Sequence, residues 1–210
     1  LIGDQSTLQQ TITRLTPEFK PEDIYIATGT QYKDVVMKQL SFIPAENFIF
    51  EPTRRDVGPE IGLSSFILDK KFSDEPIAIL WSDHLVKNES AFREALLLAE
   101  SQVRSQEAKF VFIGQHARFA NQNLGWIELG DKIEQTGTDI LYKFNKLCYR
   151  PKLDEAELFF KNDNYVWNLG YFVTTPKYLT SLFEKYVPDM AAQLQKIQHA
   201  YGTEKFEEVV

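Results

Sequence analysis

A short apolar run that ends abruptly in polar residues is the strongest constraint on how this chain folds. Residues 77–81 are all apolar, Pro76 precedes them, and Ser82-Asp83-His84 follow. Such a run is typical of a strand buried on both faces, as in a parallel sheet. Ligands of open α/β sheets gather at the carboxyl ends of the strands, where Asp83 would offer Mg²⁺ the oxygen ligand that this ion prefers. From these residues alone, we favour the interpretation that Asp83 starts a turn.

Hydrophobic periodicity predicts alternating helices and strands up to residue 114. We expect helices at 1–15, with a cap at Ser6-Thr7, and at 32–40, 58–71 and 89–106, and strands at 23–28, 47–51, 77–81 and 110–114. This alternation predicts a largely parallel sheet with right-handed crossovers. Later elements are expected as strands at 125–130, 140–144 and 165–173, and as helices at 154–161, 176–183 and 188–200. The predicted fold class is α/β, with a mixed, mostly parallel central sheet in a single domain over residues 1–210.

Composition narrows the classes of partner. Of 210 residues, 43% are hydrophobic and 25% are charged, which is ordinary for a globular domain with a sizeable core. A net charge of -7 argues against nucleic acid as a partner, because nucleic-acid binding needs a basic surface. No apolar run approaches the ~20 residues that span a bilayer, so no membrane partner is expected. The single cysteine, Cys148, excludes an intrachain disulfide and predicts a reducing, cytoplasmic compartment.

Five parts of the chain carry motifs in a fixed order and spacing: 3–9 (similar to G-D-x-S-L-L-Q), 51–61 (E-P-x-x-R-N-T-A-P-A-I), 81–84 (P-S-D-H), 124–128 (Y-G-Y-I-E), and 149–151 with 166–172 (E-K-P and L-W-N-S-G-M-F). Together they resemble one enzyme family, the sugar-1-phosphate nucleotidyltransferases. The branch they resemble most is mannose-1-phosphate guanylyltransferase, also called GDP-mannose pyrophosphorylase. The resemblance implies a Rossmann-like, three-layer α/β/α fold of the GT-A type. It also leads us to expect a catalytic domain truncated at both ends, with a Gly-rich phosphate loop before Leu1 and a second metal-binding aspartate after Val210.

The reaction implied by the resemblance is nucleotidyl transfer. A phosphate oxygen of the sugar 1-phosphate attacks the α-phosphorus of a nucleoside triphosphate, and pyrophosphate leaves. The implied substrates are GTP and mannose 1-phosphate, the product is GDP-mannose, and the cofactor is Mg²⁺; a homo-oligomer is compatible with this function. No protein nucleophile is needed, so the enzyme supplies alignment and compensation of negative charge.

Catalytic roles implied by the resemblance fall on Asp83 and Arg150. Asp83 would be a metal ligand, and the turn interpretation becomes the weaker one once the family pattern is included. Arg150 would bind the phosphate of the sugar, with a guanidinium in place of the family's lysine. His84 is expected to be structural.

Nucleotide binding is implied for Arg54, Arg55, Gly58 and Pro59. The planar fork of an arginine suits a phosphate or a base edge. Solvated surface is the alternative for one or both arginines. Gly58 and Pro59 would shape the wall beside the base, and they also fit the start of a helix, since proline is favoured in a first turn.

Sugar binding is implied for Gly125, Tyr149 and Asn168. Gly125 would let its backbone approach the sugar, because glycine has no Cβ, although a turn glycine is a serious alternative. Asn168 offers both a donor and an acceptor to sugar hydroxyls, and a β-bulge or turn residue beside Gly170 is its alternative. Tyr149 stands where the family has a glutamate, so its phenol would replace a carboxylate as a weaker acceptor.

Departures from the family pattern keep a second function open. Beyond Tyr149, Leu169 replaces a serine and Glu60 replaces an alanine. These changes favour, as the alternative, a relative that binds a nucleotide sugar or a partner subunit without catalysis.

Overall fold

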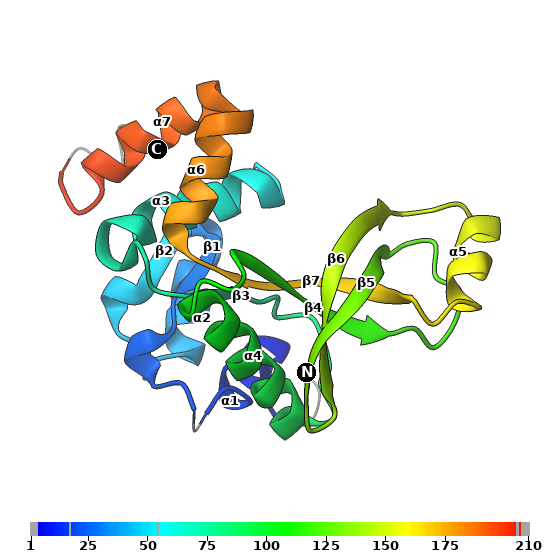
Figure 1. Ribbon diagram of the computed structural model, residues 1–210. Coiled ribbons are helices and arrows are strands. Elements are labelled where there is room, and N and C mark those ends of the chain that lie inside the picture. The colour runs from blue at the N-terminus through cyan, green and yellow to red at the C-terminus, as the bar shows by residue number, and fades with distance from the viewer. Residues whose placement is uncertain (1–3, 17, 54, 205, 207–210) are drawn as a thin grey trace. The chain divides into compact units, whose positions relative to one another are not determined.

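The computed structural model describes residues 4–16, 18–53, 55–204 and 206. In these residues helices and strands alternate along much of the chain (Figure 1), which confirms the α/β class. The α-helices are α1 (Thr7–Thr13), α2 (Lys33–Gln39), α3 (Val57–Phe72), α4 (Glu89–Arg104), α5 (Leu153–Phe160), α6 (Pro176–Tyr186) and α7 (Pro188–Ala200). The strands are β1 (Ile26–Gly29), β2 (Phe48–Glu51), β3 (Ile77–Ile79), β4 (Phe110–His116), β5 (Gly125–Thr136), β6 (Asp139–Tyr149) and β7 (Tyr165–Thr174). Short 3-10 helices are η1 (Pro21–Asp23), η2 (Thr30–Tyr32) and η3 (Ala45–Asn47).

Contacts divide the chain into two compact units, which we describe one at a time. The first unit comprises Leu1–Ile77, Ser82–Glu89 and Thr174–Val210. The second comprises Ala78–Trp81 and Ser90–Val173. Each unit is therefore assembled from separate stretches of sequence. The single domain expected over residues 1–210 stays a prediction.

A parallel strand pair and three helices form the core of the first unit. Strands β1 and β2 run parallel, with Ile26 opposite Phe48. Helix α3 packs against α6 and α7. A Cβ on Gly62 of α3 would lie 2.7 Å from Leu194 Cδ1, so the glycine permits this close approach. The core residues are Ile49, Leu63, Phe66, Ile67, Ala191 and Leu194.

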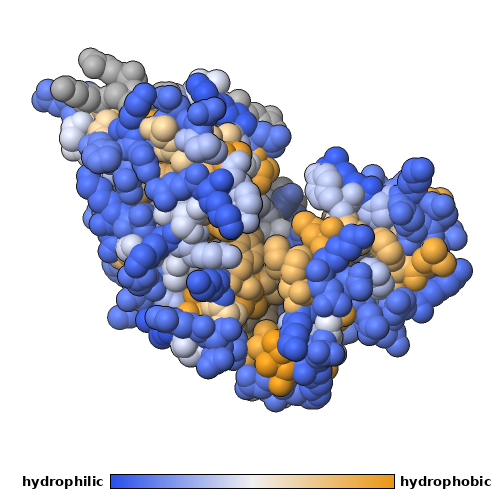
Figure 2. All heavy atoms as spheres, turned by 45° about the horizontal axis from the view of Figure 1, so that its top comes forward, coloured by the Kyte–Doolittle hydropathy of each residue, from blue (hydrophilic) through white to orange (hydrophobic). Residues whose placement is uncertain are grey.

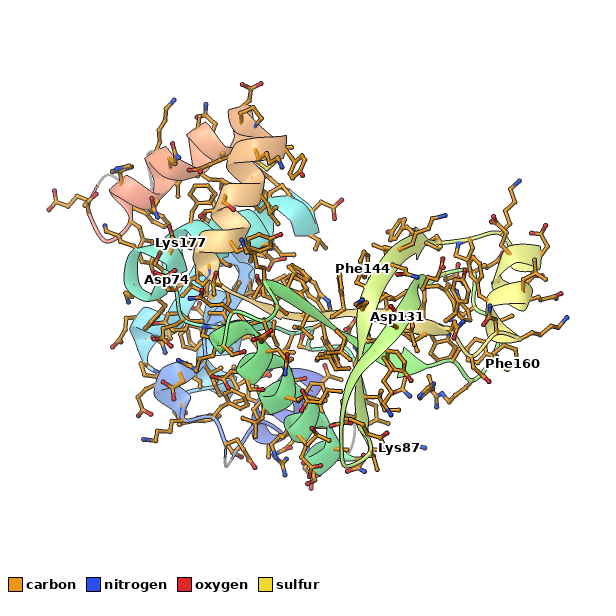
Figure 3. The ribbon with its side chains drawn as sticks, viewed as in Figure 1. Asp74, Lys87, Asp131, Phe144, Phe160 and Lys177 are labelled. Atoms are coloured by element: carbon orange, nitrogen blue, oxygen red, sulfur yellow. The ribbon has the colours of Figure 1, made fainter. Side chains whose placement is uncertain are left out.

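Local interactions fix the ends of helices in the first unit. Ser6 caps α1: its hydroxyl accepts from the Gln9 N–H at 3.1 Å, and the Gln9 side chain accepts from the Ser6 N–H at 3.0 Å. This reciprocal pair satisfies two N–H groups that the helix leaves open and confirms the predicted cap. In the first turn of α6, Lys177 pairs with Asp74 at 3.0 Å (Figure 3). Both side chains are exposed, so this ion pair adds little stability.

Mixed strand pairing is confirmed, but the described strands form two sheets instead of one central sheet. Beside the parallel β1–β2 pair lies a five-stranded sheet of order β3-β7-β5-β6, with β4 also paired to β7. Its β5–β6 and β5–β7 pairings are antiparallel. Parallel sheets need long crossovers, whereas β5 and β6 are joined by a hairpin, so their antiparallel pairing follows from the short connection.

The β5–β6 hairpin is longer than its sequence suggests. Pairing continues to Thr136 and Asp139, so Gly137 and Thr138 alone form the turn. Gly137 takes a φ of +61° at the first turn position, where a type II′ turn uses glycine. The outer half of β5 is exposed and polar, and the register shifts between residues 128 and 134. Because neither face of this part is buried, apolar alternation is missing, and its sequence resembles a loop.

Strand β3 corrects the prediction for the apolar run. It covers only Ile77–Ile79, its Ala78 is exposed, and it lies at an end of the strand order. A strand at the edge of a sheet is covered less completely than a central one, which explains why the run is not buried on both faces. Asp83 thus follows the end of the strand after an irregular connection that bends at Ser82 and Asp83.

Aromatic side chains organise the second unit. Trp126 of β5 and Trp167 of β7 are buried beside Ala156 of α5. The Trp126 ring N–H donates to the Asn121 carbonyl at 2.8 Å.

The face drawn in Figure 2 is mostly hydrophilic. In the described ranges, none of the helices has the length and apolar character that crossing a bilayer requires.

Candidate functional site

The three residues predicted to bind the sugar lie in one row across three neighbouring strands. Gly125 of β5 pairs with Tyr149 of β6 on one side and with Asn168 of β7 on the other. Residues directly opposite each other on antiparallel strands share a face of the sheet. The fold of the second unit therefore brings together residues that are far apart in the sequence.

The packing of the protein does not require a glycine at position 125. A Cβ built on it would lie 3.4 Å from Asn168 Cβ, and 3.5 Å from both Asn168 Nδ2 and Leu147 Cδ1, which are ordinary contacts. Its φ lies outside the left-handed region, so the turn interpretation does not explain the glycine either. A remaining reason for a glycine at position 125 is that a ligand approaches the backbone closely there.

Asn168 combines a structural contact with a free donor. Its Oδ1 accepts from the Gly170 N–H at 2.9 Å, as its interpretation as a turn residue predicts. Its Nδ2 makes no hydrogen bond within the part of the chain that the structure describes. This amide group lies beside Gly125 and is available to a sugar hydroxyl.

An irregularity of β7 after Asn168 joins two of the motif segments. Gly170 has a φ of +79°, and a Cβ on it would collide with the Trp81 indole ring. The Tyr171 hydroxyl donates to the Trp81 carbonyl at 3.4 Å. The residue that opens the Trp81-Ser82-Asp83-His84 segment is thus packed on the strand that carries Asn168.

Arg150 ends the row with an exposed positive charge. Its guanidinium carbon lies 5.2 Å from the centroid of the Tyr149 ring, and its φ is +46°. Both side chains are exposed. Among the described residues, no carboxylate forms an ion pair with Arg150, so its charge is available to an anion.

Asp83 belongs to the first unit, on a loop that is held by its backbone. The Nη2 of buried Arg14, which ends α1, donates to the His84 carbonyl at 2.8 Å. The Asp83 carboxylate is 81% exposed and lies 3.8 Å from His84 Nε2, too far for a hydrogen bond. No hydrogen bond to it is made by the described residues, so the structure shows no capping contact of this side chain, although the residue lies in a bend.

The donor set around Asp83 fits one kind of metal site only. Within the described ranges, no three His, Cys, Asp or Glu side chains are grouped so that they could hold an ion by themselves. Mg²⁺ commonly takes one or two carboxylates and completes its shell with water and substrate phosphates. Asp83, with its exposed oxygens, fits such a shared ion.

The segment predicted to bind the nucleotide surrounds the start of α3. Arg54 lies outside the described residues, and Arg55 is exposed. Gly58 and Pro59 lie in the first turn of α3, and a Cβ on Gly58 would meet no atom within 4 Å. Packing therefore does not require this glycine. Asp56 caps the helix from a φ of +78°, its carboxylate accepting from the Val57 N–H at 2.8 Å.

Sequence reasoning singled out Glu60 in this segment but missed its interaction with Glu51. Glu51 ends β2 and is 9% exposed, and Glu60 lies in the first turn of α3. Burial raises the pKa of both carboxyl groups, and the charge of Glu60 raises the pKa of Glu51 further. The sequence signal was the acid that directly ends a strand, facing the extra acid at position 60.

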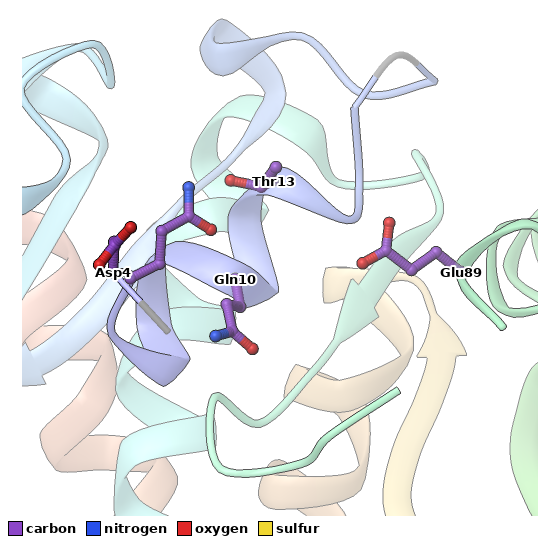
Figure 4. Close-up of a pocket in the computed structure, with 5 residues that line it drawn as sticks. Asp4, Gln10, Thr13 and Glu89 are labelled. Atoms are coloured by element: carbon purple, nitrogen blue, oxygen red, sulfur yellow. The ribbon is translucent and has the colours of Figure 1, made fainter. Parts of the chain in front are cut away.

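A hollow of about 510 Å³ lies elsewhere in the first unit, beside α1 (Figure 4). Among the described residues its lining is polar, with two carboxylates and no cationic side chain, which suits neither a triphosphate nor a sugar phosphate. None of the predicted site residues that the structure describes lines it. The lining residues are Asp4, Gln5, Gln10, Thr13 and Glu89.

The family profile described as nucleotidyl transferase matches residues 1–204. This chain belongs to that family.

Relatives of this nucleotidyl transferase chain carry one recurring name. This chain is 30% identical to mannose-1-phosphate guanylyltransferase 2 of Escherichia coli O157:H7 over 90% of its own length and 40% of the relative. It is 28% identical to mannose-1-phosphate guanylyltransferase ManC of Salmonella typhimurium over 93% of the chain and 41% of the relative. The chain thus spans about 40% of the length of these curated relatives.

Solved structures show the same fold. A structure from Thermus thermophilus, described as mannose-1-phosphate geranyltransferase, matches with a TM-score of 0.82 and 25% identity, over 100% of this chain and 58% of that one. A Helicobacter pylori structure, described as mannose-6-phosphate isomerase, matches with a TM-score of 0.75 and 19% identity, over 95% of this chain and 73% of that one. The second likeness shows the fold alone.

The predicted residues of this family member fall into two groups. Arg55, Gly58, Pro59 and Asp83 lie in the first unit, and Gly125, Tyr149, Arg150 and Asn168 lie in the second. The structure brings the second, sugar-side group together within its own unit.

Proposed function

We propose that the protein transfers a guanylyl group from GTP to mannose 1-phosphate, forming GDP-mannose and pyrophosphate. The observation that carries the proposal is the row of Tyr149, Gly125 and Asn168, formed by motif segments of a chain that matches the nucleotidyl transferase family over residues 1–204. The names of the relatives favour mannose 1-phosphate as the acceptor and GTP as the donor.

Each residue has a physical task in this reaction. Arg150 binds the acceptor phosphate, and Asn168 Nδ2 donates to a sugar hydroxyl beside the open backbone of Gly125. Arg54 and Arg55 bind the triphosphate or the base. These contacts align the attacking phosphate oxygen with the α-phosphorus, which supplies most of what a reaction without a protein nucleophile requires.

Mg²⁺ is proposed as the cofactor, with Asp83 as its protein ligand. When bound, the ion compensates the negative charge of the phosphates. Nucleoside triphosphates are cytoplasmic substrates, and together with the single cysteine this favours a cytoplasmic location.

A non-catalytic relative is the second candidate. Tyr149 and Leu169 favour it, since both replace polar groups of the family pattern in the sugar-side segments. Such a protein would bind a nucleotide sugar without forming pyrophosphate.

The test is pyrophosphate release by the complete protein. It would be incubated with Mg²⁺ and mannose 1-phosphate, and separately with each of the four common nucleoside triphosphates. We expect release with GTP and its loss when a chelator removes Mg²⁺. Release with another nucleotide alone would overturn the choice of base. No release with mannose 1-phosphate or with a panel of other sugar phosphates, combined with tight binding of GDP-mannose, would establish the non-catalytic alternative.

A further inference from the structure

The backbone at Arg150 adopts a conformation that its sequence does not favour. Strand β6 ends at Tyr149, and Arg150 follows with a φ of +46°. A non-glycine residue adopts this region rarely, because its Cβ is crowded there. Pro151 comes next, and a residue before proline prefers extended backbone. Such a conformation persists only where surrounding contacts hold it, and it points to a functional constraint.

The left-handed turn has a direct consequence for the two side chains. In a regular strand, successive side chains point to opposite faces of the sheet. Tyr149 and Arg150 would then be separated by the backbone. Because Arg150 leaves the strand conformation, its guanidinium lies over the Tyr149 ring, 5.2 Å from the centroid. This distance is within the range of a cation–π contact.

The contact leaves the N–H groups of the Arg150 guanidinium without a hydrogen-bond partner among the described residues. These groups form the fork that matches two phosphate oxygens. The ring is neutral, so it holds the guanidinium without cancelling its charge. Tyr149 also pairs with Gly125, which puts this charge beside the sugar-side row.

The two departures from the family pattern therefore complement each other. A glutamate followed by a lysine brings together a carboxylate and a point charge. A tyrosine followed by an arginine brings together a ring and a planar cation that stacks well on it. Tyr149 then has a different task from the hydrogen bond to a sugar hydroxyl that the sequence suggests.

We propose that Tyr149 is a positioning residue, whose ring holds the Arg150 guanidinium ready to bind the phosphate of a sugar 1-phosphate. This inference rests on the proposed function for the identity of the anion. The hydroxyl of Tyr149 takes no part in it.

The experiment measures phosphate binding and turnover separately in the complete protein. Calorimetric titration with mannose 1-phosphate, and with inorganic phosphate, gives Kd without any reaction. Steady-state kinetics with GTP gives the KM for each substrate. We expect Tyr149→Leu to raise the Kd and KM for mannose 1-phosphate about two- to five-fold, the factor that an exposed cation–π contact is worth. The KM for GTP should not follow.

Two further variants separate the ring from the hydroxyl and from Arg150. Tyr149→Phe should recover most of the affinity that Tyr149→Leu loses. In an Arg150→Ala background, Tyr149→Leu should have no further effect. If Tyr149→Phe binds as weakly as Tyr149→Leu, or if the loss persists without Arg150, the ring does not act by holding the guanidinium, and the inference is wrong.

Tyr186 provides a matched control. It is 67% exposed, and Lys185 Nζ lies 4.9 Å from its ring centroid, in a helix that carries no motif residue. Tyr186→Leu should leave the Kd for mannose 1-phosphate unchanged.

The inference on Tyr149 and the proposed function are overturned by different results. GDP-mannose formation that is insensitive to Tyr149→Leu would overturn the inference and leave the proposed function intact. Binding of mannose 1-phosphate that depends on Tyr149, without any nucleotide sugar formed, would support the inference and overturn the proposed reaction. A wild-type protein that binds neither mannose 1-phosphate nor inorganic phosphate would overturn the inference.

Discussion

Single side chains of the candidate site are held in different ways. The Asp83 carboxylate is exposed, whereas the backbone of its loop is fixed by Arg14. Gly125 has space for a Cβ that the protein does not use. Substitutions at these positions should therefore change function more than stability.

Replacing Asp83 with asparagine tests the metal ligand. Asp83→Asn should lower turnover about 10²-fold or more, because a neutral amide is a poor replacement for a carboxylate at Mg²⁺. The free energy of unfolding should change by less than about 0.5 kcal/mol, since the side chain is exposed. Urea unfolding and pyrophosphate release are the two measurements. Asp74→Asn, which changes an exposed aspartate outside the motifs, should leave turnover unchanged. Full turnover in Asp83→Asn would refute the assignment.

Replacing Gly125 with alanine tests the open backbone. The variant should be as stable as the parent or more stable by about 0.5–1 kcal/mol, because alanine costs less conformational entropy in a strand. Its affinity for mannose 1-phosphate should fall at least about ten-fold, since a methyl group would displace the sugar from the backbone. Thermal unfolding and calorimetric titration measure the two effects. An unchanged Kd would mean that the sugar does not approach this glycine.

Two elements hold the site segments in place by local strain and burial. The irregularity at Gly170 in β7 positions Asn168, because Gly170 packs on Trp81 and its N–H donates to the Asn168 side chain. The start of α3 follows Asp56, whose φ is positive, and carries half-buried Glu60. Each element yields a prediction about stability.

Gly170 should tolerate alanine less well than another glycine with positive φ. Gly170→Ala has to place a Cβ in the left-handed region and also against the Trp81 indole. Gly137→Ala meets only the first difficulty, since no atom lies within 4 Å of its Cβ position. The first substitution should cost more than about 1 kcal/mol and exceed the cost of the second in urea unfolding. Equal costs would show that the packing on Trp81 is not needed.

Glu60 should make stability depend on pH. Because burial raises its pKa in the folded state, the folded protein binds this proton more tightly than the unfolded chain. Stability is therefore lost as the pH rises from the ordinary carboxyl pKa through the raised one. Glu60→Gln removes this loss and also relieves Glu51, whose pKa the charge of Glu60 raises.

The measurement compares unfolding by urea at about pH 4 and about pH 7. The stability gained in Glu60→Gln should be larger at the higher pH. Glu107→Gln, at an exposed position, should change stability by less than about 0.5 kcal/mol at either pH. A gain that does not depend on pH would contradict the role given to burial.

For the whole molecule, local signals predicted elements better than they predicted pairing. The cap at Ser6 and the helix after Pro188 follow from residues close in sequence, and both are confirmed. The outer half of the β5–β6 hairpin could not be predicted, because solvent on both faces removes the alternation that marks a strand. The limited burial of β3 depends on its place at a sheet edge, which no local pattern encodes.

For the candidate site too, sequence motifs predicted single residues better than contacts between residues. Gly125, Tyr149 and Asn168 were found by their motifs, and the structure adds that they are direct neighbours across strands. The Tyr149–Arg150 contact and the Glu51–Glu60 pair needed three-dimensional information. The first depends on a positive φ, and the second depends on burial.

The most direct measurement follows the phosphorus atoms of one reaction. The complete protein would be mixed with GTP, mannose 1-phosphate and Mg²⁺, and ³¹P NMR would record every phosphate species over time. The account predicts that pyrophosphate and a sugar-linked diphosphate appear in equal amounts while mannose 1-phosphate disappears. GDP with inorganic phosphate, while mannose 1-phosphate remains unchanged, would contradict it, because the bond broken would then be the terminal one. An unchanged spectrum would contradict it as well.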